Sequence, residues 1–146
     1  MKVLVLHGPN LNLLGVREPD QYGVETLSQV DESLRAIGQR AGVEVTCRQS
    51  NHEGELIDWI QQARGRYEVI ILNPGGYTHT SVALRDAVIA SDVDCYEVHI
   101  TNTAAREPFR HKSLFADISR GSILGFGTEG YRLALTGAMS LRSSAS

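Results

Sequence analysis

The sequence is poor in cysteine and in lysine, and each shortage excludes a class of protein. Its only cysteines, Cys47 and Cys95, are far apart and lack CxxC spacing, so neither a disulfide framework nor a zinc site is predicted. Both thiols fit a reducing compartment and are expected to be small buried hydrophobes. The only lysines are Lys2 and Lys112, and neither has the buried setting that would prepare a lysine for Schiff-base chemistry.

Long apolar runs and runs of like charge are also absent. The first apolar run ends at Gly8, which is too early for a secretory signal or a membrane span. The 14 Lys and Arg residues nearly balance the 17 Asp and Glu residues, for a formal charge of −3, so neither nucleic acid nor a membrane surface is predicted as a partner. We therefore expect a cytoplasmic protein that acts on a small molecule. Its 146 residues suit a single domain, with residues 140–146 as a frayed tail.

Short apolar runs alternate with longer stretches of helical periodicity. The runs are rich in β-branched residues and predict strands at Val3–Leu6, Val43–Cys47, Val69–Leu72, Cys95–Ile100 and Ser122–Phe126. Helical spacing of apolar residues follows Thr26, Asn51 and Thr80, and Gly42 ends the first of these helices. This order predicts an α/β fold: a flavodoxin-like open parallel five-stranded sheet with helices on both faces.

Three polar segments follow predicted strands. Residues 8–23 come after the first strand, residues 73–81 after the third and residues 99–110 after the fourth. In open parallel sheets, ligands bind outside the carboxyl ends of the strands. We therefore expect these segments to form one site.

The first polar segment, GPNLNLLGVREPDQYG, carries groups suited to proton transfer. Asn10 and Asn12 offer amide donors and acceptors, and Arg17 is a permanent cation. A loop tyrosine such as Tyr22 usually packs as an apolar anchor. A nearby arginine would favour the phenolate form, which could act as a base.

The other two segments supply complementary groups, each with a simpler explanation. Glu97 and His99 alternate along a strand, so the glutamate could hold the histidine as a proton donor, or the two could form a structural pair. The segment from Asn73 to Ser81 opens a helix that suits an anion, although a capped helix start explains it equally well. Arg110 adds a cation, or is a solvated surface charge.

The segment GFGTEG, Gly125–Gly130, matches the dinucleotide-binding pattern G-x-G-x-x-G. The chain ends too soon after it for the second strand and acidic ribose ligand of a Rossmann unit, which favours a tight strand-to-helix turn. A non-catalytic flavodoxin-like module that binds nucleotide or flavin here stays an alternative. It predicts flavin or nucleotide copurifying with the protein.

Taken together, the motifs resemble those of the type II 3-dehydroquinate dehydratases from end to end. The segments GPNLNLLGVREPDQYG, QSNHEGELIDWI, ILNPGGYTHTSVALRDA, YEVHITN, REPFRHKS and GFGTEGYRLAL stand in that family's order and spacing. The resemblance implies a flavodoxin-like subunit, assembled as a dodecamer built from four trimers, without metal or organic cofactor. It also implies reversible anti dehydration of 3-dehydroquinate to 3-dehydroshikimate through an enolate, in the shikimate pathway or in quinate catabolism.

The resemblance assigns catalytic roles to five positions. Tyr22 would be the base that removes the proton beside the ketone, and Arg17 would favour its phenolate. Asn10 would help hold a water that stabilises the enolate. His99 would be the general acid for the departing hydroxyl, supported by Glu97.

The resemblance also implies substrate contacts. Asn73, His79 and Arg110 would contact the substrate hydroxyls, and Ile100–Thr101 would bind its carboxylate. Asp86, which is hard to place in the same pocket, would reach it from a neighbouring subunit. The segment Leu14–Tyr22 would act as a mobile lid.

Several positions depart from the family pattern. They are Lys112, Leu114, Glu129 and Thr101, where histidine, tyrosine, glutamine and serine are common. None is a predicted catalytic position, so packing or subunit contacts are in question rather than the chemistry. A further alternative is an enzyme of this fold acting on another hydroxy-ketone acid, which would keep the acid and base without requiring Arg110 and Asp86 together.

Overall fold

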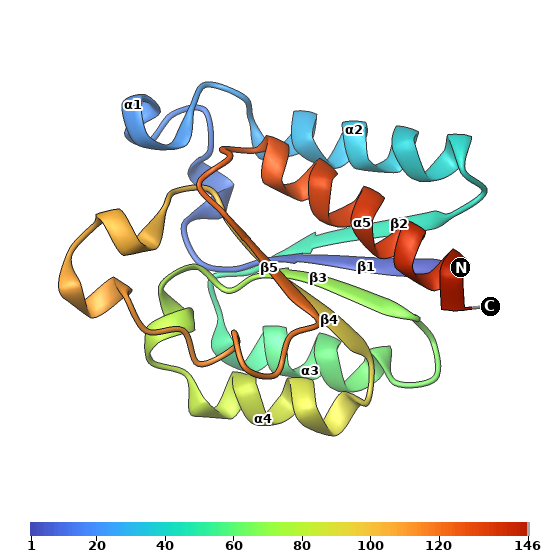
Figure 1. The fold of residues 1–146 in the computed structure, drawn as a ribbon. Coiled ribbons are helices and arrows are strands. Elements are labelled where there is room, and N and C mark those ends of the chain that lie inside the picture. The colour runs from blue at the N-terminus through green and yellow to red at the C-terminus, as the bar shows by residue number, and fades with distance from the viewer. Residues whose placement is uncertain (146) are drawn as a thin grey trace.

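The computed structural model describes residues 1–145 and shows one sheet between two helical layers (Figure 1). The strands are β1 (Lys2–His7), β2 (Glu44–Gln49), β3 (Val69–Asn73), β4 (Asp94–His99) and β5 (Gly121–Leu124). The helices are α1 (Pro19–Tyr22), α2 (Leu27–Arg40), α3 (Glu53–Ala63), α4 (Val82–Ser91) and α5 (Glu129–Ala145). Short 3-10 turns are η1 (Leu11–Leu13), η2 (Gly75–His79), η3 (Thr103–Ala105) and η4 (Pro108–Arg110).

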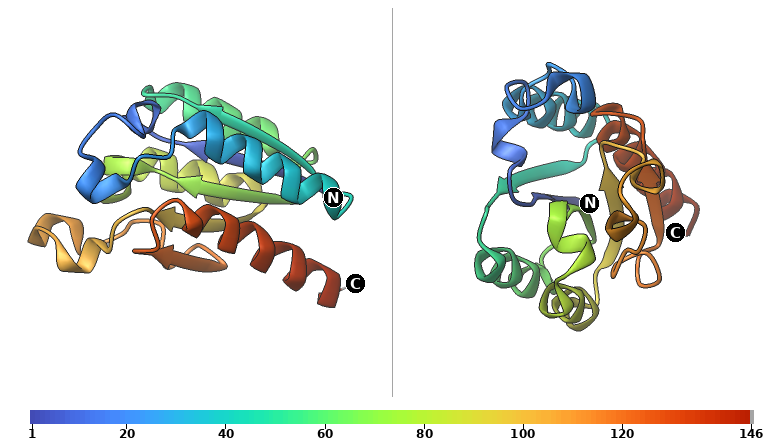
Figure 2. Two further views of the ribbon diagram at one scale, coloured as in Figure 1. Left: turned by 90° about the horizontal axis from the view of Figure 1, so that it is seen from above. Right: turned by 90° about the vertical axis from the view of Figure 1, so that its left-hand side faces the viewer.

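All described strand pairs are parallel, in the order β2-β1-β3-β4-β5. This is the order of flavodoxin-like sheets, so the predicted fold is confirmed. Helices α2 and α5 cover one face and α3 and α4 the other (Figures 1 and 2). The strand order reverses between β1 and β3, which is where such sheets bind ligands.

Alternation along the strands separates two hydrophobic cores. In β1, Val3 and Val5 face α2 and α5, whereas Leu4 and Leu6 face α3 and α4. Both sets are at most 2% exposed, which explains why the strands are nearly continuous apolar runs. Each fully buried aliphatic side chain stabilises the fold by about 1.5–3 kcal/mol relative to an exposed one.

The helix ends follow the local sequence. Thr26 and Gln29 form a reciprocal capping box at the start of α2, and Gly42 lies just beyond its end with a φ of 70°. The N-cap of α4 is Ser81, whose hydroxyl accepts a hydrogen bond from the N–H of Leu84. The helix therefore begins one residue later than the sequence predicted from Thr80.

The structure differs from the sequence expectations at the end of β5, along the last helix and in the burial of Cys47. Strand β5 ends at Leu124 because Gly125, with a φ of 85°, begins a turn. Helix α5 continues through residues 140–145, which were expected to be a frayed tail; Ser146 lies outside the described residues. Cys95 is buried as predicted, but Cys47 is only partly buried. Within residues 1–145, no helix has the length and apolar character needed to cross a membrane.

Candidate active site

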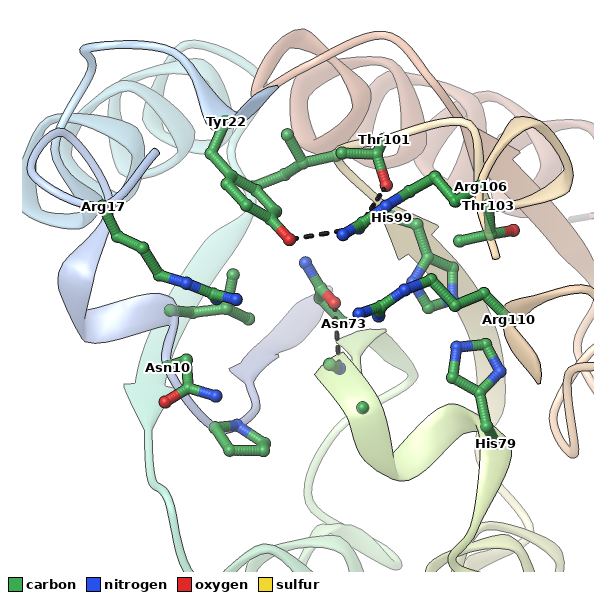
Figure 3. Close-up of a pocket in the computed structure, with 15 residues that line it drawn as sticks. Asn10, Arg17, Tyr22, Asn73, His79, His99, Thr101, Thr103, Arg106 and Arg110 are labelled. Carbon is green, nitrogen blue, oxygen red and sulfur yellow. Dashed lines mark hydrogen bonds between the residues drawn. The ribbon is translucent and has the colours of Figure 1, made fainter. Parts of the chain in front are cut away.

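A pocket opens at the carboxyl ends of β1, β3 and β4 (Figure 3). The predicted site residues that line it are Asn10, Arg17, Tyr22, Asn73, His79, His99, Ile100, Thr101 and Arg110. The three polar segments therefore meet as expected. The pocket also includes residues to which the sequence assigned no role: Pro9, Leu11, Gly75, Gly76, Thr103 and Arg106.

The loop after β1 is held tightly against the loop after β3. The N–H of Gly8 donates to the carbonyl of Asn73 at 2.8 Å. A Cβ atom at Gly8 would lie 2.5 Å from the carbonyl oxygen of Pro74, so no larger residue fits without moving backbone. Asn10 then adopts a left-handed conformation with a φ of 71°, and its N–H donates to the side chain of Asn51. This close contact brings Pro9 and Asn10 beside Asn73 and Gly75 in the lining of the pocket.

Tyr22 lies between two arginines. The guanidinium of Arg17 stands 4.9 Å from the centre of its ring. Arg106 donates from Nη1 to the Tyr22 hydroxyl oxygen and to Thr101 Oγ1, both at 3.1 Å. Both guanidinium cations therefore face the phenol. Arg106 is a functional candidate that the sequence analysis missed, although it begins the REPFRHKS motif.

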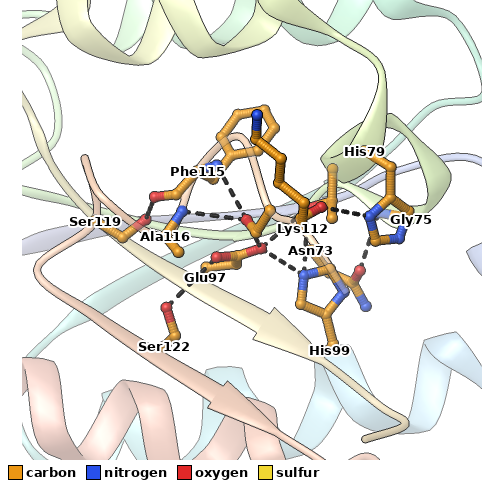
Figure 4. A network of polar contacts seen from close by, with 12 residues as sticks. Asn73, Gly75, His79, Glu97, His99, Lys112, Phe115, Ala116, Ser119 and Ser122 are labelled. Atoms are coloured by element: carbon orange, nitrogen blue, oxygen red, sulfur yellow. Dashed lines mark hydrogen bonds and ion pairs between the residues drawn. The ribbon is translucent and has the colours of Figure 1, made fainter. Parts of the chain in front are cut away.

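His99 projects from the last residue of β4 toward the pocket, with Glu97 behind it (Figure 4). The ring Nε2 lies 2.6 Å from Glu97 Oε2, and both side chains are almost completely buried. Because the glutamate accepts at Nε2, that nitrogen carries a proton and Nδ1 is left for proton transfer.

Glu97 is surrounded by donors. Its Oε2 accepts hydrogen bonds from Thr78 Oγ1 at 3.0 Å and Ser113 Oγ at 2.7 Å, and its Oε1 accepts one from Ser122 Oγ at 3.4 Å. Burial alone raises the pKa of Glu97, but the hydrogen bond and charge of His99, together with Ser113 and Thr78, bring it below its usual value. The ionised glutamate therefore accepts the hydrogen bond from His99 Nε2 and holds the ring in place.

The third wall of the pocket comes from η2 and η4. His79 Nδ1 lies 2.8 Å from the carbonyl oxygen of Lys112, so Nδ1 carries the proton. The other ring nitrogen, Nε2, can then accept a hydrogen bond. Lys112 therefore contributes through its backbone, which explains how its side chain can vary. Arg110 donates from Nε to Glu107 at 3.3 Å and also lines the pocket.

Asp86 does not join the pocket of its own chain. It lies on the exposed side of α4, and the described pocket does not include it. Two departures from the family pattern also lie outside the pocket. The carbonyl of Leu114 accepts from Arg85, and Glu129 pairs with Arg132 at 3.1 Å.

The glycine-rich turn at residues 125–130 supports β4. The N–H of Gly125 donates to the carbonyl of His99, and that of Gly127 to the carbonyl of Ile100. A Cβ at Gly130 would contact Val98 and Ile123 at 3.4 Å. Two of the amides that would hold a phosphate are thus already bonded to the chain, which supports the tight turn over the nucleotide site.

Among residues 1–145, the His, Cys and carboxylate groups close enough to hold a metal are His7, Asp31 and Cys47. Their ligand atoms lie within 4.8 Å of one another, but the His7 and Asp31 atoms already share a hydrogen bond of 2.7 Å. None of the three lines the pocket.

The fold and the site together define a class. This is a flavodoxin-like α/β protein whose pocket, at the reversal in strand order, presents three arginines, a phenol and a carboxylate-paired histidine. Three cations and no carboxylate among the lining residues suit a small anionic ligand. The phenol and imidazole suit proton transfer.

Comparison with known proteins gives the family. The model of the family described as Dehydroquinase class II matches residues 1–139, and this chain belongs to that family. A relative called 3-dehydroquinate dehydratase 2, from Pseudomonas putida, is 54% identical over 92% of this chain and 90% of its own length. A 3-dehydroquinate dehydratase from Halalkalibacterium halodurans is 52% identical over 91% of this chain and 92% of its own length.

Solved structures agree with the fold. A type II dehydroquinase from Propionibacterium acnes has a TM-score of 0.92 and 40% identity, covering 95% of this chain and 96% of its own. One from Butyrivibrio crossotus has a TM-score of 0.90 and 44% identity, covering 93% and 95%. The predicted family is therefore confirmed.

Proposed function

We propose that this chain dehydrates 3-dehydroquinate to 3-dehydroshikimate, as a step of the shikimate pathway. Family membership supports the reaction, and one observation in the structure supports it most directly. The pocket places a phenol between two arginines on one side and a histidine paired with a buried glutamate on another. Proton abstraction beside a ketone followed by loss of hydroxyl requires such a base and such an acid.

The proposed mechanism begins at Tyr22. Its phenolate takes the proton from the carbon beside the ketone, and the electron pair moves to the ketone oxygen to form an enolate. A water held with the help of Asn10 donates to that oxygen. The enolate then re-forms the ketone, the new carbon–carbon double bond develops, and the C–O bond breaks. His99 gives a proton to the departing hydroxyl, which leaves as water.

Arg17 and Arg106 divide the support of the base. Arg106 donates directly to the phenol oxygen, which stabilises the phenolate through a charge-assisted hydrogen bond. Arg17 adds positive charge over the ring and lies on the segment Leu14–Tyr22, in which residues 18–21 are exposed. We propose that this segment closes over the substrate. Crystal structures with and without a substrate analogue would refute closure if the segment held one position in both.

The remaining lining groups would bind substrate. Asn73, His79 and Arg110 would contact its hydroxyls, and Ile100–Thr101 its carboxylate. A 3-dehydroquinate molecule is anionic and rich in hydroxyls, which matches a pocket of cations and amides. The same pocket would accept another hydroxy-ketone acid, so a panel of such acids tests the alternative substrate directly.

The first experiment measures formation of the conjugated enone by ultraviolet absorbance. Wild type should convert 3-dehydroquinate, and Tyr22→Phe should lose at least about a hundredfold in kcat because the base is gone. Tyr67→Phe is the matched control, since Tyr67 lies away from the pocket. An inactive wild type with intact fold, or an active Tyr22→Phe, would refute the proposal.

The proposal extends to assembly and to the extent of the domain. Residues 1–146 would form one catalytic domain. Twelve such domains would assemble as a tetramer of trimers, in which Asp86 reaches the pocket of a neighbouring subunit. Its exposure on α4, outside its own pocket, supports this arrangement. Sedimentation of the purified protein tests the size of the assembly.

A mixing experiment tests the shared site. Asp86→Ala and Tyr22→Phe subunits, each inactive alone, are unfolded together and reassembled. If Asp86 acts across an interface, about a quarter of the sites in a random mixture combine an intact Tyr22 with an intact neighbouring Asp86. Recovery of that activity supports a shared site. No recovery, from a mixture that reaches the native size, places Asp86 outside the neighbouring pocket.

A further inference from the structure

The amide of Asn73 is tied to a buried row of polar side chains that leads away from the pocket. His7 and Asn73 are partners in the parallel register of β1 and β3, so their side chains project from the same face of the sheet. Helices α5 and α2 cover that face and supply Tyr131 and Asp31. His7 and Tyr131 are 0% exposed and Asn73 is 3% exposed.

Hydrogen bonds connect all four side chains. Asn73 Nδ2 lies 2.9 Å from the Tyr131 hydroxyl, which lies 2.9 Å from His7 Nδ1. His7 Nε2 lies 2.7 Å from Asp31 Oδ1. The His7 and Tyr131 rings also meet edge to face, with centroids 5.0 Å apart. A row of polar side chains in an otherwise apolar core is costly unless each member has hydrogen-bond partners. Every buried polar atom of this row has one.

The direction of every bond in the row can be assigned, starting from Asn73. The N–H of Gly75 can only donate, so the amide atom 3.1 Å from it is the oxygen of Asn73. The amide nitrogen then donates to Tyr131, whose own hydrogen is left for His7 Nδ1. With Nδ1 as an acceptor, His7 carries its proton on Nε2 and donates it to Asp31.

The charged and titratable neighbours of His7 keep this direction. Asp31 and Cys47 lie nearest to it, and Arg35 interacts with Cys47. Burial and the charge of Asp31 raise the pKa of the Cys47 thiol to about 12, so the thiol stays protonated. Burial raises the pKa of Tyr131 above its usual value, so it remains a phenol that can donate. Asp31 is the acceptor at the end of the row.

We propose that Asp31, His7 and Tyr131 are positioning residues that lock the side-chain amide of Asn73 in one orientation for substrate binding. This inference rests on the proposed function, in which Asn73 contacts a substrate hydroxyl. With its nitrogen held by Tyr131 and its oxygen held by Gly75, the amide presents one remaining N–H and one remaining oxygen lone pair to the pocket. An amide turned by half a rotation would exchange donor and acceptor and mismatch that hydroxyl.

Steady-state kinetics of matched variants test the proposal. Tyr131→Phe removes one hydroxyl and leaves the ring, so the amide nitrogen of Asn73 loses its buried acceptor. KM for 3-dehydroquinate should rise roughly tenfold while kcat changes less than about twofold, since the lost interaction is made equally before and during reaction. A purely structural role would instead reduce the amount of active enzyme and lower kcat at an unchanged KM, which would overturn the proposal.

Two further comparisons separate positioning from packing. His7→Asn places an amide oxygen where Nδ1 stood, so it should keep KM within about threefold, whereas His7→Leu removes the acceptor and should match Tyr131→Phe. Tyr96→Phe and Cys47→Ala are the controls, because Tyr96 belongs to the same core and Cys47 lies beside Asp31, yet neither is in the row. Equal KM values for His7→Asn and His7→Leu would overturn the proposal.

A neutron structure of the substrate-free protein tests the row without any assay. The proposal expects deuterium on His7 Nε2 and on the Tyr131 hydroxyl, directed at His7 Nδ1. Deuterium on Nδ1, or an Asn73 amide with its oxygen toward Tyr131, would overturn it. If wild type failed to act on 3-dehydroquinate while the neutron structure showed the expected hydrogens, the proposed function would fail and the orientation of Asn73 would stand.

Discussion

Replacing Glu97 by glutamine tests how the buried carboxylate supports proton donation by His99. The change keeps the size of the side chain but removes its charge and replaces one acceptor oxygen with an N–H donor. Three hydroxyl groups and the Nε2–H of His99 all donate to Glu97 in the wild type, with the His99 contact at 2.6 Å. Protonated His99 would therefore lose its counter-charge, and one donor would face another.

The expected size of the effect follows from the burial of the pair. Glu97 and His99 are 2% and 7% exposed, so solvent screens their attraction poorly. A hydrogen bond to a charged group contributes about 1.5–3 kcal/mol, and two charges about 4 Å apart attract by roughly 4 kcal/mol in a moderately polar site. A loss of about 2–4 kcal/mol in the stability of the imidazolium corresponds to a fall in kcat of roughly 30- to 1,000-fold.

The assay is the pH profile of enone formation. Glu97→Gln should have a lower kcat than the wild type at every pH tested, because His99 loses the carboxylate that accepts from its Nε2. KM should change little, since Glu97 lies behind the pocket lining. Glu25→Gln is the matched control, because it breaks the Glu25–Arg132 pair, which does not line the pocket. A variant with a native kcat and pH profile would refute the role of Glu97.

Three further predictions concern stability and reactivity. The pKa of Glu97 is lower in the folded protein than its ordinary 4.5. Its contribution to stability is therefore complete above pH 4.5 and is lost as the pH falls through the folded value. In urea unfolding across that range, Glu97→Gln should lose less of its free energy of unfolding than the wild type does. Burial raises the pKa of Cys47 and of Cys95 to about 12, so folded protein should react with iodoacetamide at pH 8 much more slowly than unfolded protein, and equal rates would contradict this. Gly8→Ala should destabilise the protein by about 1–3 kcal/mol and lower its activity, because the new Cβ would lie 2.5 Å from a backbone oxygen. Gly54→Ala, which has open space around it in α3, should instead stabilise the protein by up to about 1 kcal/mol. Thermal unfolding of both variants checks the contrast.

Hydrophobic periodicity and capping residues determined the fold class, because both act over a few neighbouring residues. Five strands followed from β-branched runs, and three helices followed from the helical spacing after Thr26, Asn51 and Thr80. The exact ends of the strands and helices were harder to predict from the sequence. Strand β5, for example, stops where Gly125 turns and its N–H bonds the carbonyl of His99. Helix α5 runs on through residues whose composition had suggested a tail.

The sequence also located most of the site, because the carboxyl ends of parallel strands meet at one edge. Asn10, Asn73 and His99 each follow or end a strand, so topology alone brings them together. The partners of these residues were decided by the tertiary structure. Arg106 reaches Tyr22 across 84 residues of sequence, and Tyr131 reaches Asn73 across 58. Such contacts depend on how separate loops and helices pack, and no local pattern in the sequence encodes that packing. The motifs that carry the chemistry are contiguous, so the sequence alone identifies them.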